Sequence, residues 1–238
     1  MVTQVGRADL ARLAMGDFKQ QTHPRKELLI VVDEGEAAKS VFEDLARTLG
    51  MAEMCRVLCA PKSNLGALRN FSMRMAEGTV LAQWDDDDRY HPLRLSLQWE
   101  AMCQQAAQAC FLTDQWHYFS SEQSLFWCDW SQEPYPLNFV QGTMLVAREV
   151  RPSYPELKRG EDTALCWEMI RAQVPIARVR DQGWCYTYVY HGANVWERSH
   201  HQAIVRAHAL GPAAMQNRAK LMQQRWSEYK PGFAIARP

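Results

Sequence analysis

The chain has 238 residues, of which 47% are hydrophobic and 23% charged, and its 27 basic side chains balance 27 acidic ones. This is the composition of a folded chain with a substantial core, rather than of a disordered one. Its longest aliphatic run, residues 28–32, is far shorter than the ~20 apolar residues that cross a bilayer. The seven cysteines form no CxxC pair and no apolar leader opens the chain, so we expect a cytoplasmic protein without a disulfide framework or a zinc ribbon.

Strand and helix signals alternate through the first half of the chain. Aliphatic runs predict strands at residues 27–33, 56–59 and 79–84, and apolar side chains at helical spacing follow each of them. Gly78 ends the second helix and Pro92 opens the third. This β-α-β-α-β-α order predicts an α/β fold with a mostly parallel sheet, which binds ligands at the carboxyl ends of its strands.

The second half has a less regular pattern. We expect strands of variable length at residues 111–113, 116–119, 125–128, 139–146 and 184–190. A helix is predicted over residues 162–172, and another over 200–224 with a break at Gly211-Pro212. No internal repeat separates the halves, so the pattern favours two halves that share one sheet.

Charge is unevenly distributed along the chain. From Arg198 to the C-terminus the sequence has seven Lys and Arg residues and a single acidic residue, Glu228. The formal net charge is therefore +6 in this segment and −6 over residues 1–197. Residues 197–238 are therefore predicted to form a basic helical extension that either contacts anionic lipid at the inner membrane face or is a solvated helix. The basic residues are thinly spaced, so nucleic acid is not an expected partner.

Four consecutive carboxylates form the strongest local signal: Asp85, Asp86, Asp87 and Asp88. Adjacent carboxylates repel each other by roughly 1 kcal/mol per pair even in water. Directly after a predicted buried strand, this repulsion favours a bound cation, and carboxylate oxygens suit Mg²⁺ or Mn²⁺. The alternative is an acidic surface turn in which Asp88 caps the helix that begins near Pro92.

The surroundings of these aspartates match a family pattern. Residues 64–70 (N-L-G-A-L-R-N), Ala76, Gly78 and residues 84–92 (W-D-D-D-D-R-Y-H-P) resemble glycosyltransferase family 2, whose pattern is N-x-G-x-x-x-R-N, A-x-G, a strand, and D-x-D-D-x-aromatic-x-P. Residues 7–33 are similar to the family's first helix and second strand, residues 160–163 to its "ED" motif, and residues 190–194 to its late histidine segment.

The resemblance covers about residues 1–196 and implies the nucleotide-sugar-binding GT-A fold, an αβα sandwich. Residues 1–110 would be its nucleotide-binding half and residues 111–196 its mixed, acceptor-binding half. By the same resemblance, Asp87 and His191 hold Mn²⁺ or Mg²⁺, and Asp162 is the general base. The expected donor-binding residues are Thr3, Asp33, Asn64, Arg69, Asp85 and Asp86.

Each role has a simpler alternative. Asp162 sits where a carboxylate is stabilised as a helix cap, and His191 is an ordinary core or surface histidine if the resemblance fails. Thr3, Asp33 and Arg69 are then a strand residue, a turn acid and a helix-surface charge. On the acceptor side we expect Trp116, Trp127 and Trp130, with His117, Tyr118 and Gly142-Thr143 beside them; Trp faces stack on sugars but equally fill cores.

The sequence also departs from the family pattern. Val5-Gly6 stands where the family has Tyr-Asn or Phe-Asn, Asp33-Glu34-Gly35 replaces Asp-Asp-Gly-Ser, and Met1 falls inside the expected first strand. These changes weaken the case for uridine but leave the metal and base positions intact.

The resemblance implies a metal-dependent, inverting glycosyltransferase that moves a sugar from a nucleotide-sugar, a UDP-sugar in the first instance, to a hydroxyl of a glycan or lipid-linked acceptor. One alternative is a sugar-phosphate nucleotidyltransferase, although residues 1–7 lack its Gly-rich basic loop. The other is a pseudo-transferase that binds nucleotide-sugar or glycan without turnover.

Overall fold

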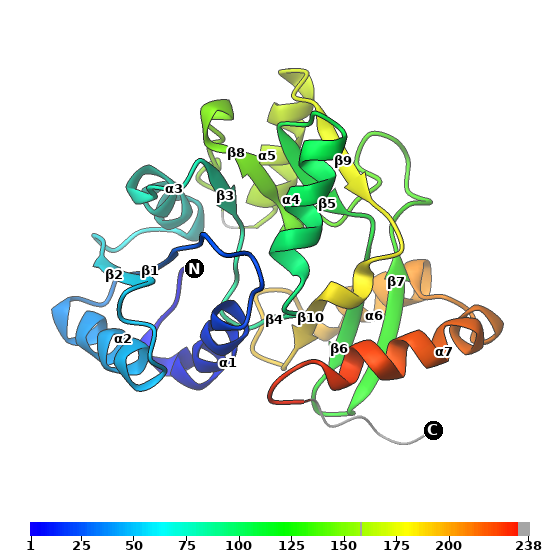
Figure 1. The fold of residues 1–238 in the computed structure, drawn as a ribbon, viewed down its shortest axis with the longest axis horizontal. Helices are drawn as coiled ribbons and strands as arrows, with labels where there is room; N and C mark the ends of the chain where they lie inside the picture. The colour runs from blue at the N-terminus through cyan, green and yellow to red at the C-terminus, as the bar shows by residue number, and fades with distance from the viewer. Residues whose placement is uncertain (158, 233–238) are drawn as a thin grey trace.

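A computed structural model describes residues 1–157 and 159–232. Its first layer is a parallel pair of strands, β1 (Leu28–Val32) and β2 (Cys55–Cys59), with Leu28 opposite Cys55. β1 is buried on both faces: Ile30 and Val32 pack in the cluster that includes α1 (Ala8–Lys19) and α2 (Glu36–Thr48), whereas Val31 packs with Leu68 of α3 (Leu65–Met75). In Figure 1, α1 and α2 lie on one side of these strands and α3 on the other.

The first three residues run beside β1. Val2 forms a parallel bridge with Val31, and the N-terminal amine donates to the Leu29 carbonyl at 2.7 Å. Met1 and Val2 also line a small cavity with Leu81 and Ala82 of β3 (Val80–Ala82), so this segment lies between β1 and β3. The expected first strand is thus reduced to a single bridge, and it delivers Thr3 to the carboxyl end of β1.

A four-stranded sheet continues the layer in the order β3, β8 (Leu145–Ala147), β5 (Ala109–Leu112) and β9 (Ile176–Val179). The β5–β9 pair is parallel, and β8 is antiparallel to both β3 and β5. α4 (Arg94–Gln104) contacts β5 and β9, while Leu165 and Met169 of α5 (Glu161–Arg171) pack in a cluster with Phe111.

The predicted strand at 139–146 is correct only at its end. Thr143 lies in a 3₁₀ turn, η2 (Gln141–Thr143), and its hydroxyl accepts from the Leu112 amide at 2.9 Å and donates to the Val140 carbonyl at 2.6 Å. A side chain thereby takes the ladder position that a strand backbone would occupy, so regular pairing begins only at Leu145.

The second four-stranded sheet, called the second sheet below, contains β4 (Arg89–Tyr90), β10 (Tyr186–Tyr190), β6 (Asp114–Phe119) and β7 (Ser124–Asp129) in that order. Only the β6–β10 pair is parallel. β10 starts two residues later than predicted, because a turn, η4 (Gly183–Cys185), precedes it. A Cβ atom on Gly183 would lie 2.6 Å from the backbone of Asp114, so this close approach requires glycine. The predicted α/β class is confirmed, in sheets that mix parallel and antiparallel strands.

α6 (Arg198–His208) and α7 (Pro212–Ser227) flank the predicted break and pack against the second sheet (Figure 1). The Leu210 amide donates to the Trp127 carbonyl at 2.9 Å, and Trp226 packs edge-on against Trp116. Tyr229 is 1% exposed.

Three of the basic residues in this segment have acidic partners. The pairs are Arg198–Glu122, Arg218–Asp181 and Arg225–Glu228. Arg237 and the rest of 233–238 lie outside the described residues. Across the part that the structure describes, no helix combines the length and the apolarity of a membrane span. Lipid contact by this segment stays a prediction.

Candidate active site

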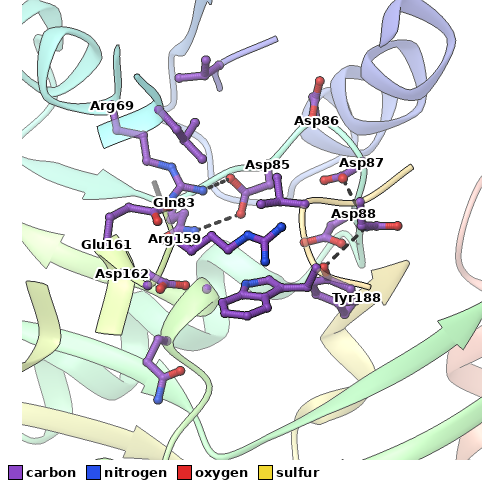
Figure 2. Close-up of a pocket in the computed structure, with 18 of the residues that line it drawn as sticks. Arg69, Gln83, Asp85, Asp86, Asp87, Asp88, Arg159, Glu161, Asp162 and Tyr188 are labelled. Carbon is purple, nitrogen blue, oxygen red and sulfur yellow. Dashed lines mark hydrogen bonds and ion pairs between the residues drawn. The ribbon is translucent and has the colours of Figure 1, made fainter. Parts of the chain in front are cut away.

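A cavity of about 720 Å³ opens where the carboxyl ends of β1 and β3 face the second sheet and α6. Figure 2 shows its centre, with Glu161 and Asp162 on one side, Asp86, Asp87 and Asp88 on the other, and Asp85 between them. The cavity lining brings together most of the predicted site residues: Thr3, Asp33, Arg69, Asp85, Asp86, Asp87 and Asp162. Asn64 and His191 are not part of that lining, although each supports it.

Aromatic side chains hold the loop of four aspartates. The Tyr90 hydroxyl donates to the Asp85 carbonyl at 2.9 Å, and its ring stacks on Trp84 at 3.7 Å. Arg94, which is fully buried, lies 4.8 Å from the centre of the Tyr90 ring and 5.4 Å from that of Tyr186. These rings and the guanidinium pack against the base of the loop and so support its four aspartates.

Asp88 points into this buried layer beneath the loop and does not cap a helix. It is 2% exposed, accepts from the Tyr186 hydroxyl at 2.5 Å, and accepts from the Val189 amide at 3.0 Å. Burial and the charge of Asp87 raise the pKa of Asp88 well above its usual range. α4 begins at Arg94, and its N-cap residue, Leu93, has no side-chain cap. The acidic surface turn is therefore wrong for Asp88.

Asp86 and Asp87 share one cation, Arg7. The Arg7 Nη2 atom lies 2.8 Å from Asp86 Oδ1 and 2.5 Å from Asp87 Oδ2. The Thr3 hydroxyl donates to the other oxygen of Asp86 at 2.7 Å. Burial, followed by the charge of Asp87, raises the pKa of Asp86 to about 6.

His191 directly follows β10, and its side chain contacts Asp87. Its Nε2 atom lies 3.1 Å from Asp87 Oδ2, and its backbone amide donates to Asn194 Oδ1 at 2.9 Å, which fixes the turn. Burial alone would raise the pKa of Asp87, but the hydrogen bond of His191 and the charge of Arg7 bring it below its usual value. The carboxylate is thus ionised at neutral pH.

This donor set fits a divalent ion that substrate phosphates also coordinate. Within the described chain, no three His, Cys, Asp or Glu side chains gather into an all-protein metal site. Mg²⁺ and ions like it are, however, commonly held by one or two carboxylates together with phosphate oxygens. Asp87 Oδ2 and His191 Nε2 converge to 3.1 Å, so one carboxylate and one imidazole would be available to an ion, and an imidazole nitrogen is more suited to Mn²⁺ than to Mg²⁺.

Arg69 connects the aspartate loop to α5. Its Nη2 atom lies 2.6 Å from Asp85 Oδ1 and its Nη1 atom 2.8 Å from Glu161 Oε1 (Figure 2). Gln83 donates to the second oxygen of Asp85 at 2.9 Å, and the Tyr154 hydroxyl donates to Gln83 at 2.9 Å. Arg69 is therefore a central ion-pair partner, not the simple surface charge of the alternative interpretation.

The remaining residues of the 64–70 motif position Arg69. Asn64 accepts from the Ala67 amide at 2.9 Å and so caps α3. A Cβ on Gly66 would lie 2.5 Å from the Pro155 carbonyl oxygen, so only glycine permits this approach. Asn70 both donates to and accepts from the backbone of Tyr154, at 2.8 and 2.7 Å. Asn64, predicted as a donor-binding residue, has a structural role in these contacts.

Asp162 lies in the first turn of α5 and lines the cavity. The N-cap position belongs to Gly160, which has a φ of +75° and leaves the capping site without a side chain. Asp162 Oδ1 accepts from the Thr163 amide at 2.8 Å. Its other oxygen has no hydrogen-bond partner among the described residues that would compete with a ligand.

Two of the three departures from the family pattern contact each other. The Val5 amide donates to Glu34 Oε2 at 2.7 Å, so Glu34 ties the segment after Thr3 to the end of β1. Asp33, beside it, lines the cavity and accepts weakly from the Ser63 amide at 3.4 Å. Asp33 consequently keeps acceptor capacity that faces the cavity.

The predicted acceptor-side aromatics divide between core and cavity. Trp116 and Trp127 are each 1% exposed and pack edge-to-face at 5.4 Å, so they fill the core under α7. Trp130, His117 and Gly142 line the cavity.

Comparison with known proteins agrees with this arrangement. The sequence profile described as Glycosyl transferase family 2 matches residues 8–144, more than half of the chain. The chain belongs to glycosyl transferase family 2. No curated protein sequence matches it.

Solved structures show the same fold at low identity. Residues 1–349 of S. aureus TarS in complex with UDP match with a TM-score of 0.61 at 15% identity, over 92% of this chain and 70% of that one. The UDP-GlcNAc complex of TarS matches with 0.61 at 13%, over 94% and 70%. The mannosyltransferase PcManGT from Pyrobaculum calidifontis, with GDP-Man and Mn²⁺, matches with 0.61 at 12%, over 94% and 66%. The GT-A fold predicted for this family 2 chain is confirmed.

Several site residues of this family 2 glycosyltransferase were not predicted from the sequence. In the sequence, Arg7 only begins the segment that is similar to the family's first helix, and Glu161 only precedes Asp162 in the ED motif. Gln83 and Tyr154 carried no signal at all. One sequence feature could have indicated Arg7. It is a basic residue four positions after Thr3, in a chain whose acidic loop needs a cation.

Proposed function

We propose that this glycosyltransferase moves a sugar from a nucleoside diphosphate sugar, a UDP-sugar in the first instance, to a hydroxyl group of a glycan or lipid-linked acceptor, with inversion and with Mn²⁺ or Mg²⁺. The observation that carries the proposal is the convergence of His191 Nε2 and Asp87 Oδ2, 3.1 Å apart, at the edge of the cavity that Asp87 and Asp162 both line. The nucleotide-sugars named for TarS and PcManGT support the donor class.

The chain's own residues then divide the work. Asp87 and His191 would hold the ion, which would stabilise the charge that grows on the leaving diphosphate. Thr3, Asp33 and Asp86 line the cavity on the side of β1 and would bind the nucleoside part of the donor. Arg69 keeps Asp85 in place through its ion pair and its tie to Glu161.

Asp162 would accept the proton of the acceptor hydroxyl. Its place across the cavity from Asp87 suits attack from the face opposite the leaving group (Figure 2). The oxygen that loses its proton forms the new glycosidic bond as the bond between the anomeric carbon and diphosphate breaks.

The test is donor turnover. UDP-glucose, UDP-galactose, UDP-GlcNAc and GDP-mannose would each be incubated with Mn²⁺, with and without chelator, and release of nucleoside diphosphate measured. We expect release from at least one donor, its loss with chelator, and its loss in Asp87→Asn. The matched control is Asp44→Asn, at an exposed position of α2, and we expect this variant to keep its activity. Donor binding without any release would identify a pseudo-transferase and contradict the proposal.

A further inference from the structure

Another part of the cavity is lined by residues of α6 and β6. Four polar side chains that line it have buried atoms without a hydrogen-bond partner among the described residues. These atoms belong to Gln115 (Oε1), His117 (both ring nitrogens), Trp130 (Nε1) and His201 (both ring nitrogens). Gln115 and His117 are two positions apart on β6, so they project from the same face of the second sheet.

The two histidines are buried against each other and a tyrosine. His117 is 0% exposed and His201 2% exposed, and their ring centres lie 5.3 Å apart. The Tyr188 ring lies 5.1 Å from each of them, because Tyr188 is the β10 partner of His117. Buried polar atoms in folded proteins almost always have partners, so this cluster is an exception that requires an explanation.

A metal ion does not explain the cluster. In contrast to the Asp87–His191 pair, these four side chains include no carboxylate, and among the described residues no three His, Cys, Asp or Glu side chains are arranged to hold an ion. A phosphate group fits poorly as well, because it would need charged imidazolium rings. Burial and the nearby His201 and His200 lower the pKa of His117 to about 3, and burial and His200 lower that of His201 to about 4, against a smaller opposite effect of the Trp196 backbone.

A neutral imidazole presents one N–H donor and one acceptor nitrogen. A hydroxyl group likewise donates and accepts, so neighbouring hydroxyls on a ring match the cluster in number and in type. Gln115 Oε1 adds an acceptor and Trp130 Nε1 adds a donor. We infer that Gln115, His117, Trp130 and His201 form a subsite for an uncharged, hydroxyl-rich group, the sugar ring of the acceptor. This inference rests on the proposed function, since the same cavity would hold the donor at the aspartate loop.

The rim above this subsite is aromatic. Trp196, which is 38% exposed, stacks on His200 with ring centres 4.4 Å apart, and both line the cavity. Such faces favour the C–H surface of a sugar ring, and the Arg159 guanidinium lies over the Trp196 ring on the same rim, 4.9 Å from the ring centre.

The imidazole nitrogens are buried beside α6, so a ligand would reach them only with a displacement of this helix, which would carry His201 with it. The C-terminal end of α6 is tied to β7, by the Cys128–Ala209 bridge and by the Leu210 amide bond to Trp127. Its first turn is held by the exposed Arg198–Glu122 ion pair, and exposed pairs contribute little. The helix is therefore fixed at its C-terminal end, where His208 also stacks on Trp130 with ring centres 4.1 Å apart.

The test follows the imidazole resonances of the two histidines by NMR at pH 7. His117→Gln and His201→Gln assign the signals. Methyl glycosides of glucose, galactose and N-acetylglucosamine, and glycerol, would be titrated into the wild-type chain, with inorganic phosphate as the charged comparison. We expect the His117 and His201 signals to shift with at least one glycoside and not with phosphate. Signals that stay fixed with all four polyols, or that shift equally with phosphate, would overturn the inference.

Two apolar variants separate a binding role from a structural one. Replacing an unpartnered imidazole with a phenyl ring removes unsatisfied atoms, so His117→Phe should melt at or above the wild-type temperature while glycoside affinity falls by about three- to tenfold. His117→Leu is the second variant in case the larger ring disturbs packing. His23→Phe, on the surface beside Trp99, is the matched control with unchanged affinity. Melting several degrees lower in both His117 variants, with glycoside binding retained, would show a structural role instead.

Failure of this inference and failure of the proposed function remain distinct. The titration contains no donor and measures no turnover, so a wild-type chain that binds glycoside but releases no nucleoside diphosphate contradicts only the proposed function. A chain that turns over donor while its histidine signals ignore every glycoside contradicts only the subsite.

Discussion

The guanidinium of Arg7 lies 2.5 Å from Asp87 Oδ2, the same oxygen that lies 3.1 Å from His191 Nε2. The carboxylate predicted to bind a metal ion thus already has a cation of the chain beside it. An ion that binds Asp87 has to displace this guanidinium or share the oxygen with it, since two positive charges at this separation repel each other.

Removal of Arg7 should therefore strengthen metal binding. In Arg7→Ala, Asp87 loses its competing cation, and we expect Mn²⁺ affinity without nucleotide to rise by about tenfold. Free Mn²⁺ would be measured by electron paramagnetic resonance. Arg12→Ala, an exposed arginine on the same α1 helix, should leave affinity unchanged. Weaker Mn²⁺ binding in Arg7→Ala would mean that Arg7 organises the site rather than competing for it.

A carboxamide at position 162 should separate proton transfer from binding. Asp162→Asn keeps the side-chain volume but cannot take the acceptor proton, so transfer should fall by about 10²–10⁴-fold. Donor affinity by calorimetry and melting temperature should both stay near wild type, because Gly160 and not Asp162 holds the N-cap position. Transfer at the wild-type rate by a folded, donor-binding variant would remove Asp162 from the mechanism.

Loss of Arg69 should cost more stability than loss of either partner's charge. Arg69→Met leaves Asp85 and Glu161 without their cation, and we expect the free energy of unfolding to fall by about 3 kcal/mol. Glu161→Gln keeps a hydrogen-bond acceptor for Arg69 and should cost about 1 kcal/mol. Urea denaturation measures both.

The control for this comparison is a pair outside the site. Arg56→Met breaks the exposed ion pair with Glu77 and should cost less than about 1 kcal/mol. Equal losses for Arg56→Met and Arg69→Met would show that the pairs of Arg69 contribute no more than surface ion pairs.

Acid should destabilise the folded chain through His117. Its folded-state pKa, lowered to about 3 by burial, lies below the ordinary value of about 6.5, so the unfolded chain binds more protons as pH falls through 6.5. From pH 7 to pH 5 this imidazole contributes a loss of roughly 2 kcal/mol, and in His117→Phe that part of the loss should disappear.

The difference between the two chains isolates this effect. Asp86 and Asp114, whose pKa values burial raises to about 6 and about 7, act in the opposite direction, but both chains carry them. Urea unfolding at pH 7 and pH 5 gives the two free energies. The same acid loss in both chains would show that His117 is not buried in its neutral form.

The family motif predicted the part of the cavity around the aspartate loop better than the part at α6. Asp85, Asp87 and Asp162 line the cavity as the motif implied, because short motifs at strand ends and helix starts are fixed by local chain geometry. Arg7 and Glu161 depended on contacts between segments far apart in the sequence, so no spacing revealed them.

The part of the cavity at α6 and β6 could not be predicted from hydrophobic periodicity. All six residues of β6 are buried, so the strand lacks the polar–apolar alternation that would have set Gln115 and His117 apart from Trp116. His201 lies on a helix predicted as a basic extension, where its neighbours suggested solvent. The fold brings it over β6 instead, and only the tertiary structure gives that placement.

The burial of Tyr229 bears on where this chain can be cut. Its hydroxyl donates to the Trp184 carbonyl at 2.8 Å, while Glu228 accepts from His91 at 2.6 Å, so the last helix is tied to two segments of the catalytic fold. The family profile ends at residue 144 and the motifs end near 194. A truncation designed from either limit would strip α7 from Trp116 and Trp184 and leave large indole surfaces open to aggregation, so the smallest recombinant fragment worth expressing extends through Tyr229.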